Sequence, residues 1–277
     1  MVNIQHPFKE RINEINVAID AIYESGNAVM KVYDQNFTSS VKDDKSPITE
    51  ADIQSNEILQ KHLSQIGFTI LSEESIDDKI RLEQDYVWII DPLDGTSDFI
   101  NRTGEFTIMI ALVKSKIPIL GLVYWPLEDK LFIAHENEGA YVFAEKIWKK
   151  IQVNKIQKLE DCEAVGSRHH LSEHERKFLD ELKLEKFTEK GSSLKAMDIS
   201  NGNSELYITT TNKIKQWDTC ASNCILRESG GKMTDIFGNE LEYNTENVNH
   251  ENGILATNSI IHNEVVTEYK NFLNKTK

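Results

Sequence analysis

The chain has 277 residues, 39 % hydrophobic and 27 % charged, which is an ordinary composition for a soluble globular protein. Its 31 lysines and arginines against 45 aspartates and glutamates give a formal net charge of −14, which disfavours non-specific binding to nucleic acid or anionic membranes. No apolar run approaches the length of a membrane span, the first residues show no signal-peptide pattern, and three scattered cysteines form no disulfide framework. We expect a cytoplasmic protein, with a peripheral position at the inner membrane as the alternative.

The first part of the chain predicts two helices followed by a largely antiparallel sheet. Apolar residues at helical spacing predict a helix from Phe8 to about Tyr33. A polar loop over 35–46 and a helix from about Thr49 to Gln65 follow. Short apolar runs then predict strands at 68–71, 87–90, 107–113, 120–124, 131–134 and 140–143.

Further along the chain, predicted helices and strands alternate, which indicates α/β organisation. We expect strands at 164–166, 186–188, 205–209, 231–234 and 254–256, and helices at 173–182, 194–200, 218–229 and 259–273. The expected domains are an N-terminal α+β half over 1–155 and a C-terminal α/β half over 156–277. No flexible linker marks the boundary between them.

Two aspartates follow the apolar strand Val87–Ile90, in the run Asp-Pro-Leu-Asp-Gly-Thr over residues 91–96. Two like charges held close together repel each other. A divalent cation removes that repulsion, and Mg²⁺ binds through a few carboxylates while it keeps waters and substrate phosphate as further ligands. The run therefore predicts a metal site, with a plain turn as the alternative, because Asp-Pro and Asp-Gly are also turn dipeptides.

Carboxylates also follow the apolar run 68–71, at Glu73 and Glu74. If this strand and Val87–Ile90 are neighbours, Glu73 can share a metal ion with Asp91. The alternative is an acidic surface loop, because more acidic residues come shortly afterwards.

Two more segments carry aspartates that could belong to such a site. The run Lys-Ser-Pro-Ile-Thr-Glu-Ala-Asp over 45–52 ends at Asp52, which with Thr49 also fits the capping box of a helix. The run Gln-Trp-Asp-Thr-Cys-Ala over 216–221 precedes the Gly-Gly pair at 230–231, and by itself it is an ordinary helix start.

Together these segments resemble the inositol monophosphatase superfamily of Mg²⁺-dependent, lithium-sensitive phosphomonoesterases. Its two signatures are a strand followed by Asp-Pro-(Ile/Leu)-Asp-Gly-Thr and a Trp-Asp block leading to a Gly-Gly pair, and both occur here in the right order. The chain is most similar to the 3′(2′),5′-bisphosphate nucleotidases of the CysQ type, because of Asp-Lys-Ser-Pro-Ile-Thr at 44–49, Ser-Arg-His-His at 167–170 and Gly-Ser-Ser-Leu-Lys at 191–195. The resemblance covers nearly the whole chain and implies an αβαβα layered sandwich with the metal site between its halves.

The resemblance also implies a role for each site residue. It implies two or three Mg²⁺ ions per site, with ligands at Glu73, Asp91, Leu93 (through its backbone carbonyl), Asp94 and Asp218. Thr96 and Asp52 would polarise the water that attacks phosphorus. Glu74 would orient ligands or water. Substrate contacts are expected at Glu73, Gly95, Thr96, Ser167, Arg168, His170, Ser193, Lys195 and Asp218.

Two departures from the pattern fall on the substrate side. His169 stands where the similar enzymes carry a serine, and residues 209–215 lack the arginine and the Gly-Pro of the bacterial nucleotidases. The adenine contacts are therefore left open, whereas the metal ligands are not affected. For Lys195, the alternative to phosphate binding is a surface lysine on a helix.

The resemblance implies hydrolysis of the 3′-phosphate of 3′-phosphoadenosine 5′-phosphate (PAP), with its sulfated relative PAPS as a second substrate. A phosphatase of inositol or sugar monophosphates is the alternative enzyme, and a partner-binding subunit with vestigial activity is the alternative outside enzymes. The expected partner is a small phosphorylated molecule and not a nucleic acid, and the expected assembly is a monomer or homodimer.

Overall fold

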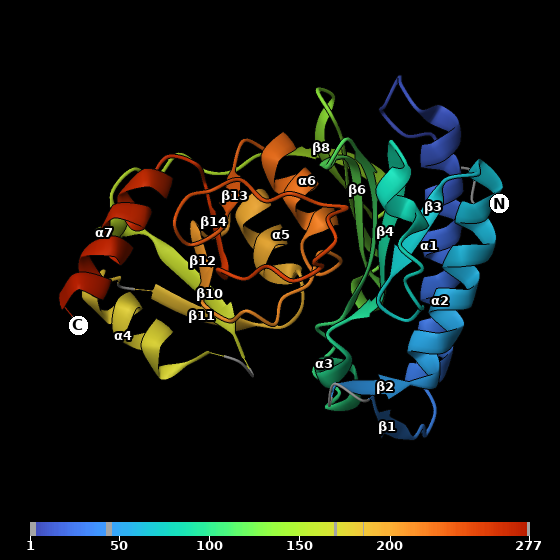
Figure 1. The fold of residues 1–277 in the computed structure, drawn as a ribbon, viewed down its shortest axis with the longest axis horizontal. Coiled ribbons are helices and arrows are strands. Elements are labelled where there is room, and N and C mark those ends of the chain that lie inside the picture. Colours follow the sequence, from blue (N-terminus) through green and yellow to red (C-terminus); the bar gives the residue numbers. More distant parts are fainter. Residues whose placement is uncertain (1–3, 43–45, 169–170, 185, 276–277) are drawn as a thin grey trace.

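The computed structural model describes residues 4–42, 46–168, 171–184 and 186–275, and its elements stack in five layers (Figure 1). Helices α1 (Ile12–Tyr33) and α2 (Glu50–Leu63) cover the outer face of one sheet, and α4 (Glu173–Glu181) and α7 (His262–Lys275) cover that of the other. Helices α5 (Leu194–Ser200) and α6 (Cys220–Glu228) lie between the sheets. The expected αβαβα sandwich is therefore confirmed.

The larger sheet has seven strands in chain order. They are β3 (Thr69–Ser72), β4 (Tyr86–Asp94), β5 (Thr107–Lys114), β6 (Ile117–Trp125), β7 (Lys130–His135), β8 (Gly139–Ala144) and β9 (Ile147–Ile151). Only the first pair, β3 and β4, is parallel, and every later neighbour is antiparallel. This agrees with the largely antiparallel sheet predicted from the sequence.

Strand β4 shows why this sheet is buried on both faces. Successive side chains of a strand point to opposite faces. Trp88 and Ile90 pack with the apolar residues of α1 and α2, whereas Val87 and Ile89 pack on the side of α5 and α6. A strand buried on both faces is a continuous apolar run in the sequence, as this one is.

The smaller sheet has five strands in the order β11-β10-β12-β14-β13. They are β10 (Glu163–Ser167), β11 (Lys186–Lys190), β12 (Leu206–Thr209), β13 (Lys232–Thr234) and β14 (Ile254–Thr257). Strand β10 is parallel to β11 and β12, and β14 is antiparallel to β12 and β13. The division into halves at residue 155 stays a prediction, and the chain passes from the larger sheet to the smaller one between β9 and β10.

Four elements differ from the prediction. Strands β1 (Ser39–Val41) and β2 (Pro47–Thr49) form a hairpin where a polar loop was expected, β9 was not expected, and the short helix α3 (Thr96–Ile100) follows β4. Single 3₁₀ turns occur at Ser64–Ile66, Ile80–Glu83, Pro126–Glu128 and Leu159–Asp161. Among the helices of the described residues, none combines the length and the apolar character that a membrane crossing needs.

Candidate active site

The first two predicted ligands belong to neighbouring strands, with Glu73 directly after β3 and Asp91 within β4. Strands β3 and β4 are parallel, with Ser72 opposite Ile90, and the amide of Glu73 donates to the carbonyl of Ile90 at 3.4 Å. Glu73 therefore comes off β3 beside Asp91, as expected for adjacent strands. Asp91 is buried, with 1 % of its surface exposed. Its Oδ1 accepts a hydrogen bond from the amide of Leu93 at 3.0 Å.

The sequence predicted a strand that ends at Ile90, but β4 continues to Asp94. Asp91 lies opposite Met109 and Asp94 opposite Thr107, and the register shifts between the two pairs. Pro92 has no N–H to give to the neighbouring strand, so a bulge at this point is expected. The bulge lies between the two aspartates.

Gly95 turns the chain from β4 into α3. Its φ is +89°, in the left-handed region that favours glycine. A Cβ here would also lie 3.1 Å from the carbonyl oxygen of Glu105 and 3.1 Å from the Cβ of Ser192. Any other residue would therefore strain this turn and push against the C-terminal half of the molecule.

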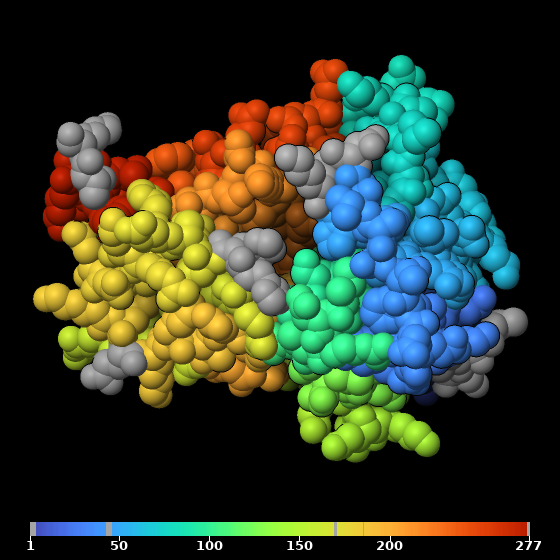
Figure 2. Space-filling view, turned by 90° about the horizontal axis from the view of Figure 1, so that it is seen from below, coloured from blue at the N-terminus to red at the C-terminus, as the bar shows by residue number. Residues whose placement is uncertain are grey.

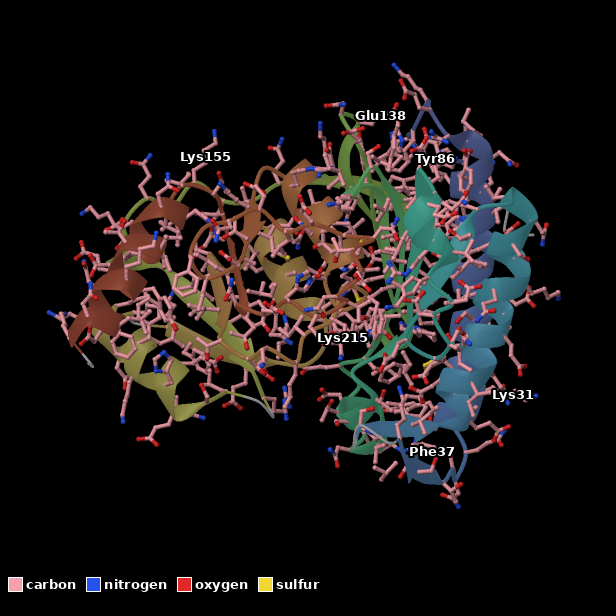
Figure 3. All side chains as sticks on the ribbon, in the orientation of Figure 1. Lys31, Phe37, Tyr86, Glu138, Lys155 and Lys215 are labelled. Atoms are coloured by element: carbon pink, nitrogen blue, oxygen red, sulfur yellow. The ribbon has the colours of Figure 1, made fainter. Side chains whose placement is uncertain are left out.

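Residues of the C-terminal half reach the same place from two helix starts. Asp218 stands just before α6, and its Oδ2 accepts a hydrogen bond from the amide of Lys215 at 2.7 Å. The amide of Ser193, just before α5, donates to Oδ2 of Asp94 at 2.5 Å. Both helices lie between the sheets, and Figure 3 shows Lys215 where the C-terminal half meets the segment below β4. The structure thus brings Glu73, Asp91, Asp94 and Asp218 to one place.

The electrostatics of this place favour a bound cation. Burial raises the pKa of the Asp91 and Asp218 carboxyls well above the ordinary value, and the charges of Glu73 and Asp94 raise it further. Burial also raises the pKa of Asp94, against the opposing charge of Lys195. Such a set of hard oxygen donors fits Mg²⁺ in its chemistry. As they stand, however, no three acidic, histidine or cysteine side chains within the described parts of the chain form a group that could hold a metal ion.

A lysine that the sequence did not single out binds the nearby glutamates. Lys42 Nζ donates to Glu73 Oε1 at 2.9 Å and to Glu74 Oε1 at 2.5 Å. Burial raises the pKa of Glu74 to about 7, and the bond from Lys42 opposes that rise. Lys42 precedes the Asp-Lys-Ser-Pro run, of which residues 44 and 45 lie outside the described part of the structure.

Asp52 contacts both Thr49, at the start of α2, and Thr96, after β4. Its Oδ2 accepts from the amide of Thr49 at 2.7 Å and from Thr49 Oγ1 at 2.6 Å, so the capping box of α2 is present. Its Oδ1 accepts from Thr96 Oγ1 at 3.0 Å, and Thr96 Oγ1 also lies 3.2 Å from the carbonyl of Leu93. Burial raises the pKa of Asp52, against these hydrogen bonds.

Lys195 is not a surface lysine, because only 8 % of it is exposed. Its Nζ donates to the carbonyl of Ser192 at 2.5 Å and lies 5.3 Å from the centre of the Tyr207 ring. Burial lowers its pKa, and the charge of Asp94 is the largest opposing effect. Ser193, two residues earlier, shares a 2.8 Å hydrogen bond with Thr107.

The remaining predicted substrate contacts follow β10. Ser167 ends that strand, and Arg168 comes directly after it. Arg168 Nη2 donates to Glu105 Oε2 at 2.8 Å and to the carbonyl of Glu189 at 3.4 Å. His169 and His170 lie outside the described residues. The surface is hollowed between the N-terminal half (blue and green) and the C-terminal half (yellow), with orange residues deep between them (Figure 2).

The chain is similar to known proteins over most of its length. The 3′(2′),5′-bisphosphate nucleotidase CysQ of Buchnera aphidicola is 35 % identical over 229 residues, which cover 79 % of this chain and 83 % of that protein. CysQ of Escherichia coli K12 is 34 % identical over 228 residues, which cover 79 % of this chain and 89 % of that protein.

Solved structures have the same fold. CysQ from Bacteroides thetaiotaomicron has a TM-score of 0.77 and 29 % identity over 90 % of this chain and 98 % of that one. The IMPase of Thermotoga maritima has a TM-score of 0.81 and 25 % identity over 96 % of this chain and all (100 %) of that one. The model of the inositol monophosphatase family matches residues 11–272. The chain therefore belongs to the inositol monophosphatase family, as its sequence motifs predicted.

Proposed function

We propose that this protein is a Mg²⁺-dependent phosphomonoesterase that hydrolyses the 3′-phosphate of PAP to give AMP and phosphate, with PAPS as a second substrate. The observation that carries the proposal is the meeting of Asp91, Asp94 and Glu73 with Asp218 from the opposite half. The names of the relatives at 34–35 % identity support the choice of a bisphosphate nucleotide.

The proposed metal ligands are the carboxylates of Glu73, Asp91, Asp94 and Asp218 and the backbone carbonyl of Leu93. When bound there, Mg²⁺ ions supply charge neutralisation at the phosphoryl oxygens and a water that is easily deprotonated. Binding requires these side chains to turn from their present partners, such as Lys42 for Glu73 and the Ser193 amide for Asp94. Glu74 stays bound to Lys42 in this proposal and helps to orient Glu73.

Asp52 and Thr96 are the proposed proton acceptors. Thr96 Oγ1 donates its hydrogen to Asp52 Oδ1, so its oxygen lone pairs are available to a water on the opposite side. As the water attacks phosphorus, Thr96 Oγ1 takes its proton and passes its own to Asp52 Oδ1. Burial raises the pKa of Asp52, which makes this carboxylate a stronger base than an exposed one.

The second phosphate of the substrate is assigned to Lys195 and Arg168. Lys195 is buried beside Asp94, and Arg168 lies at the end of β10. A lysine acts on phosphate as a point charge and an arginine as a planar fork, so together they favour a substrate with two anionic groups over one. Gly95, Ser167 and Ser193 are the proposed neutral contacts, with His170 on the same side.

The test is phosphate release from PAP, inositol 1-phosphate and fructose 1,6-bisphosphate in Mg²⁺, with wild type, Asp91→Asn and Asp85→Asn. Asp85 precedes the same strand but is exposed at its far end, so it controls for the loss of one negative charge. The proposal predicts a strong preference for PAP that Asp91→Asn abolishes and Asp85→Asn leaves intact.

Other outcomes select the alternatives. A preference for inositol 1-phosphate would keep the metal chemistry and overturn the choice of substrate. No release from any substrate, together with a stable complex in a pull-down, would favour a partner-binding subunit. The cytoplasmic location and the monomeric or homodimeric state stay predictions.

A further inference from the structure

Glu105 joins two segments of the C-terminal half to the N-terminal half. It lies between α3 and β5, and its Oε2 accepts hydrogen bonds from Arg168 Nη2 at 2.8 Å and from the amide of Gly191 at 2.7 Å. These donors are 63 and 86 positions away in the chain. One carboxylate oxygen thus fixes both the residue after β10 and the segment before α5.

The backbone at this junction is packed without spare room. A Cβ on Gly191 would lie 2.5 Å from Asp98 Oδ2 and 2.8 Å from the carbonyl oxygen of Glu105. Two residues further on, the amide of Ser193 donates to Asp94 at 2.5 Å. The Glu105 bond to Gly191 therefore holds a segment that also touches a proposed metal ligand.

Within the described residues, Arg168 is held through one nitrogen of its guanidinium. Nη2 donates to Glu105 Oε2 and to the carbonyl of Glu189. No described residue accepts a hydrogen bond from its Nε or Nη1, and 34 % of the side chain is exposed. A guanidinium has five N–H donors in one plane, so fixing Nη2 sets the direction of the others.

We propose that Glu105 is a positioning residue for substrate selection: it orients Arg168 so that Nε and Nη1 bind the substrate phosphate that does not react. This inference rests on the proposed function, because it requires a substrate with a second anionic group. Glu105 itself stays paired with Nη2 and Gly191 and does not touch the substrate. A preorganised arginine loses less side-chain entropy on binding, which strengthens binding of the second phosphate.

The experiment compares Glu105→Ala, Glu105→Gln, Arg168→Ala and the double variant Glu105→Ala/Arg168→Ala with wild type. For each, the Kd of PAP is measured by calorimetry, and kcat and KM are measured on PAP and on p-nitrophenyl phosphate, which has a single phosphate. Arg176→Ala is the control, because Arg176 pairs with Glu189 at 4.0 Å and both side chains are exposed.

Glu105→Ala and Arg168→Ala should each weaken PAP binding about tenfold, the effect of one charge-assisted hydrogen bond. Their kcat on PAP should stay within about twofold, since Glu105 acts on a group remote from the reacting phosphate. The double variant should bind no more weakly than Arg168→Ala, because Glu105 acts through Arg168. Glu105→Gln should be intermediate, since its amide oxygen can still accept both donors. The kcat/KM on p-nitrophenyl phosphate should fall less than that on PAP, because this substrate has no second phosphate, and all values for Arg176→Ala should be unchanged.

The following results would overturn the inference. Equal losses of kcat/KM on the two substrates would show that Glu105 has a merely structural role. Additive losses of PAP binding in the double variant would show that Glu105 does not act through Arg168. Tighter PAP binding by Glu105→Ala would show that Glu105 competes with the substrate for Arg168. The proposed function fails separately, if wild type binds PAP with the expected dependence on Glu105 but releases no phosphate. Turnover of PAP without any effect at Glu105 would overturn the inference alone.

Discussion

Thr96 donates a 3.0 Å hydrogen bond to Asp52, although the two residues are 44 positions apart. The other oxygen of the Asp52 carboxylate closes the capping box of α2 through Thr49. One side chain therefore anchors the start of a helix and faces the turn after β4. Replacing Asp52 should therefore change both the stability of α2 and the proposed proton transfer.

Replacing Asp52 with asparagine should lower kcat by roughly 10²- to 10⁴-fold, the usual contribution of a general base. The amide oxygen can still accept one hydrogen bond, but it cannot take a proton at neutral pH. Loss of part of the cap should cost about 1 kcal/mol of unfolding free energy. Steady-state kinetics and urea unfolding measure the two effects.

Thr96 provides the matched comparison for that variant. Thr96→Ser keeps the hydroxyl and should retain most of the activity, whereas Thr96→Val removes it and should resemble Asp52→Asn. Near wild-type kcat in both Asp52→Asn and Thr96→Val would show that neither residue moves the proton.

Asp91→Asn should make the metal-free protein more stable while it abolishes activity. Asp91 is buried close to like charges, including those of Glu73 and Asp94. A neutral asparagine at this position removes the repulsion between them. We expect a gain of at least about 1 kcal/mol in chelator, because a shift of one pKa unit corresponds to about 1.4 kcal/mol. Chemical denaturation with EDTA at neutral pH measures it.

Mg²⁺ should reverse that order of stability. At a concentration a hundredfold above its Kd, a ligand adds about 2.7 kcal/mol to the stability of the protein that binds it. Wild type and Asp85→Asn should gain this stability, and Asp91→Asn should gain little. An Asp91→Asn protein that is less stable than wild type in chelator, or equally stabilised by Mg²⁺, would contradict the assignment.

Gly121→Ala should destabilise the packing of α6 on the larger sheet. A Cβ at Gly121, in β6, would lie 2.4 Å from the carbonyl oxygen of Ala221 and 2.9 Å from the Cβ of Cys224. Overpacking of this kind costs about 1–3 kcal/mol. Gly67→Ala is the comparison, because its φ is +84° but nothing lies within 4 Å, so its cost of about 1 kcal/mol comes from backbone conformation alone. Thermal unfolding measures both losses of stability. A smaller loss for Gly121→Ala than for Gly67→Ala would show that α6 can move away from the sheet.

His262 should make the fold sensitive to acid. Its Nε2 lies 2.9 Å from Thr234 Oγ1 and its Nδ1 lies 2.9 Å from Thr257 Oγ1, inside the C-terminal half. Thr234 gives its own hydrogen to the carbonyl of Asp235, so it accepts from Nε2–H, and the ring is neutral with Nδ1 as acceptor. Burial, with a smaller contribution from the charge of Lys232, lowers the pKa of this ring from 6.5 to about 4.

Between pH 6.5 and 4 the unfolded chain therefore binds a proton at His262 that the folded protein does not bind. The stability that depends on the neutral ring is complete above pH 6.5 and is lost as the pH falls toward 4, by up to about 1.4 kcal/mol per pH unit. His262→Gln should remove this part of the slope in urea unfolding measured from pH 7 to 4.5. An unchanged slope would show that the ring does not titrate as described.

The fold could be predicted where the pattern of apolar residues is strong. The continuous run 87–90 gave a strand buried on both faces, and the residues of α5 were predicted with their observed bounds. The hairpin β1–β2 was missed because β1 is three residues long and wholly exposed, so no apolar alternation marks it. Strand β9 carries two exposed lysines in the middle of five residues, which hides its alternation.

The candidate site could be predicted only as far as its short motifs extend. Asp91 and Asp94 lie in one short run of sequence. The position of Glu73 beside Asp91 was predicted because both apolar strands are followed by carboxylates. Glu105 could not be found in this way, because its partners are contributed by β10 and by the segment before α5. Lys42 was missed for the same reason, since its glutamate partners are 31 and 32 positions away.

The most direct test of the central claim is to identify the products formed from PAP by the wild-type protein in Mg²⁺, by chromatography and phosphate assay. The account predicts AMP and one equivalent of phosphate, since it assigns the 5′-phosphate to the cationic side of the site and the 3′-phosphate to the carboxylates. Formation of adenosine 3′-phosphate would show that the substrate binds the other way round. Intact PAP, in a protein that hydrolyses inositol 1-phosphate under the same conditions, would contradict the claim.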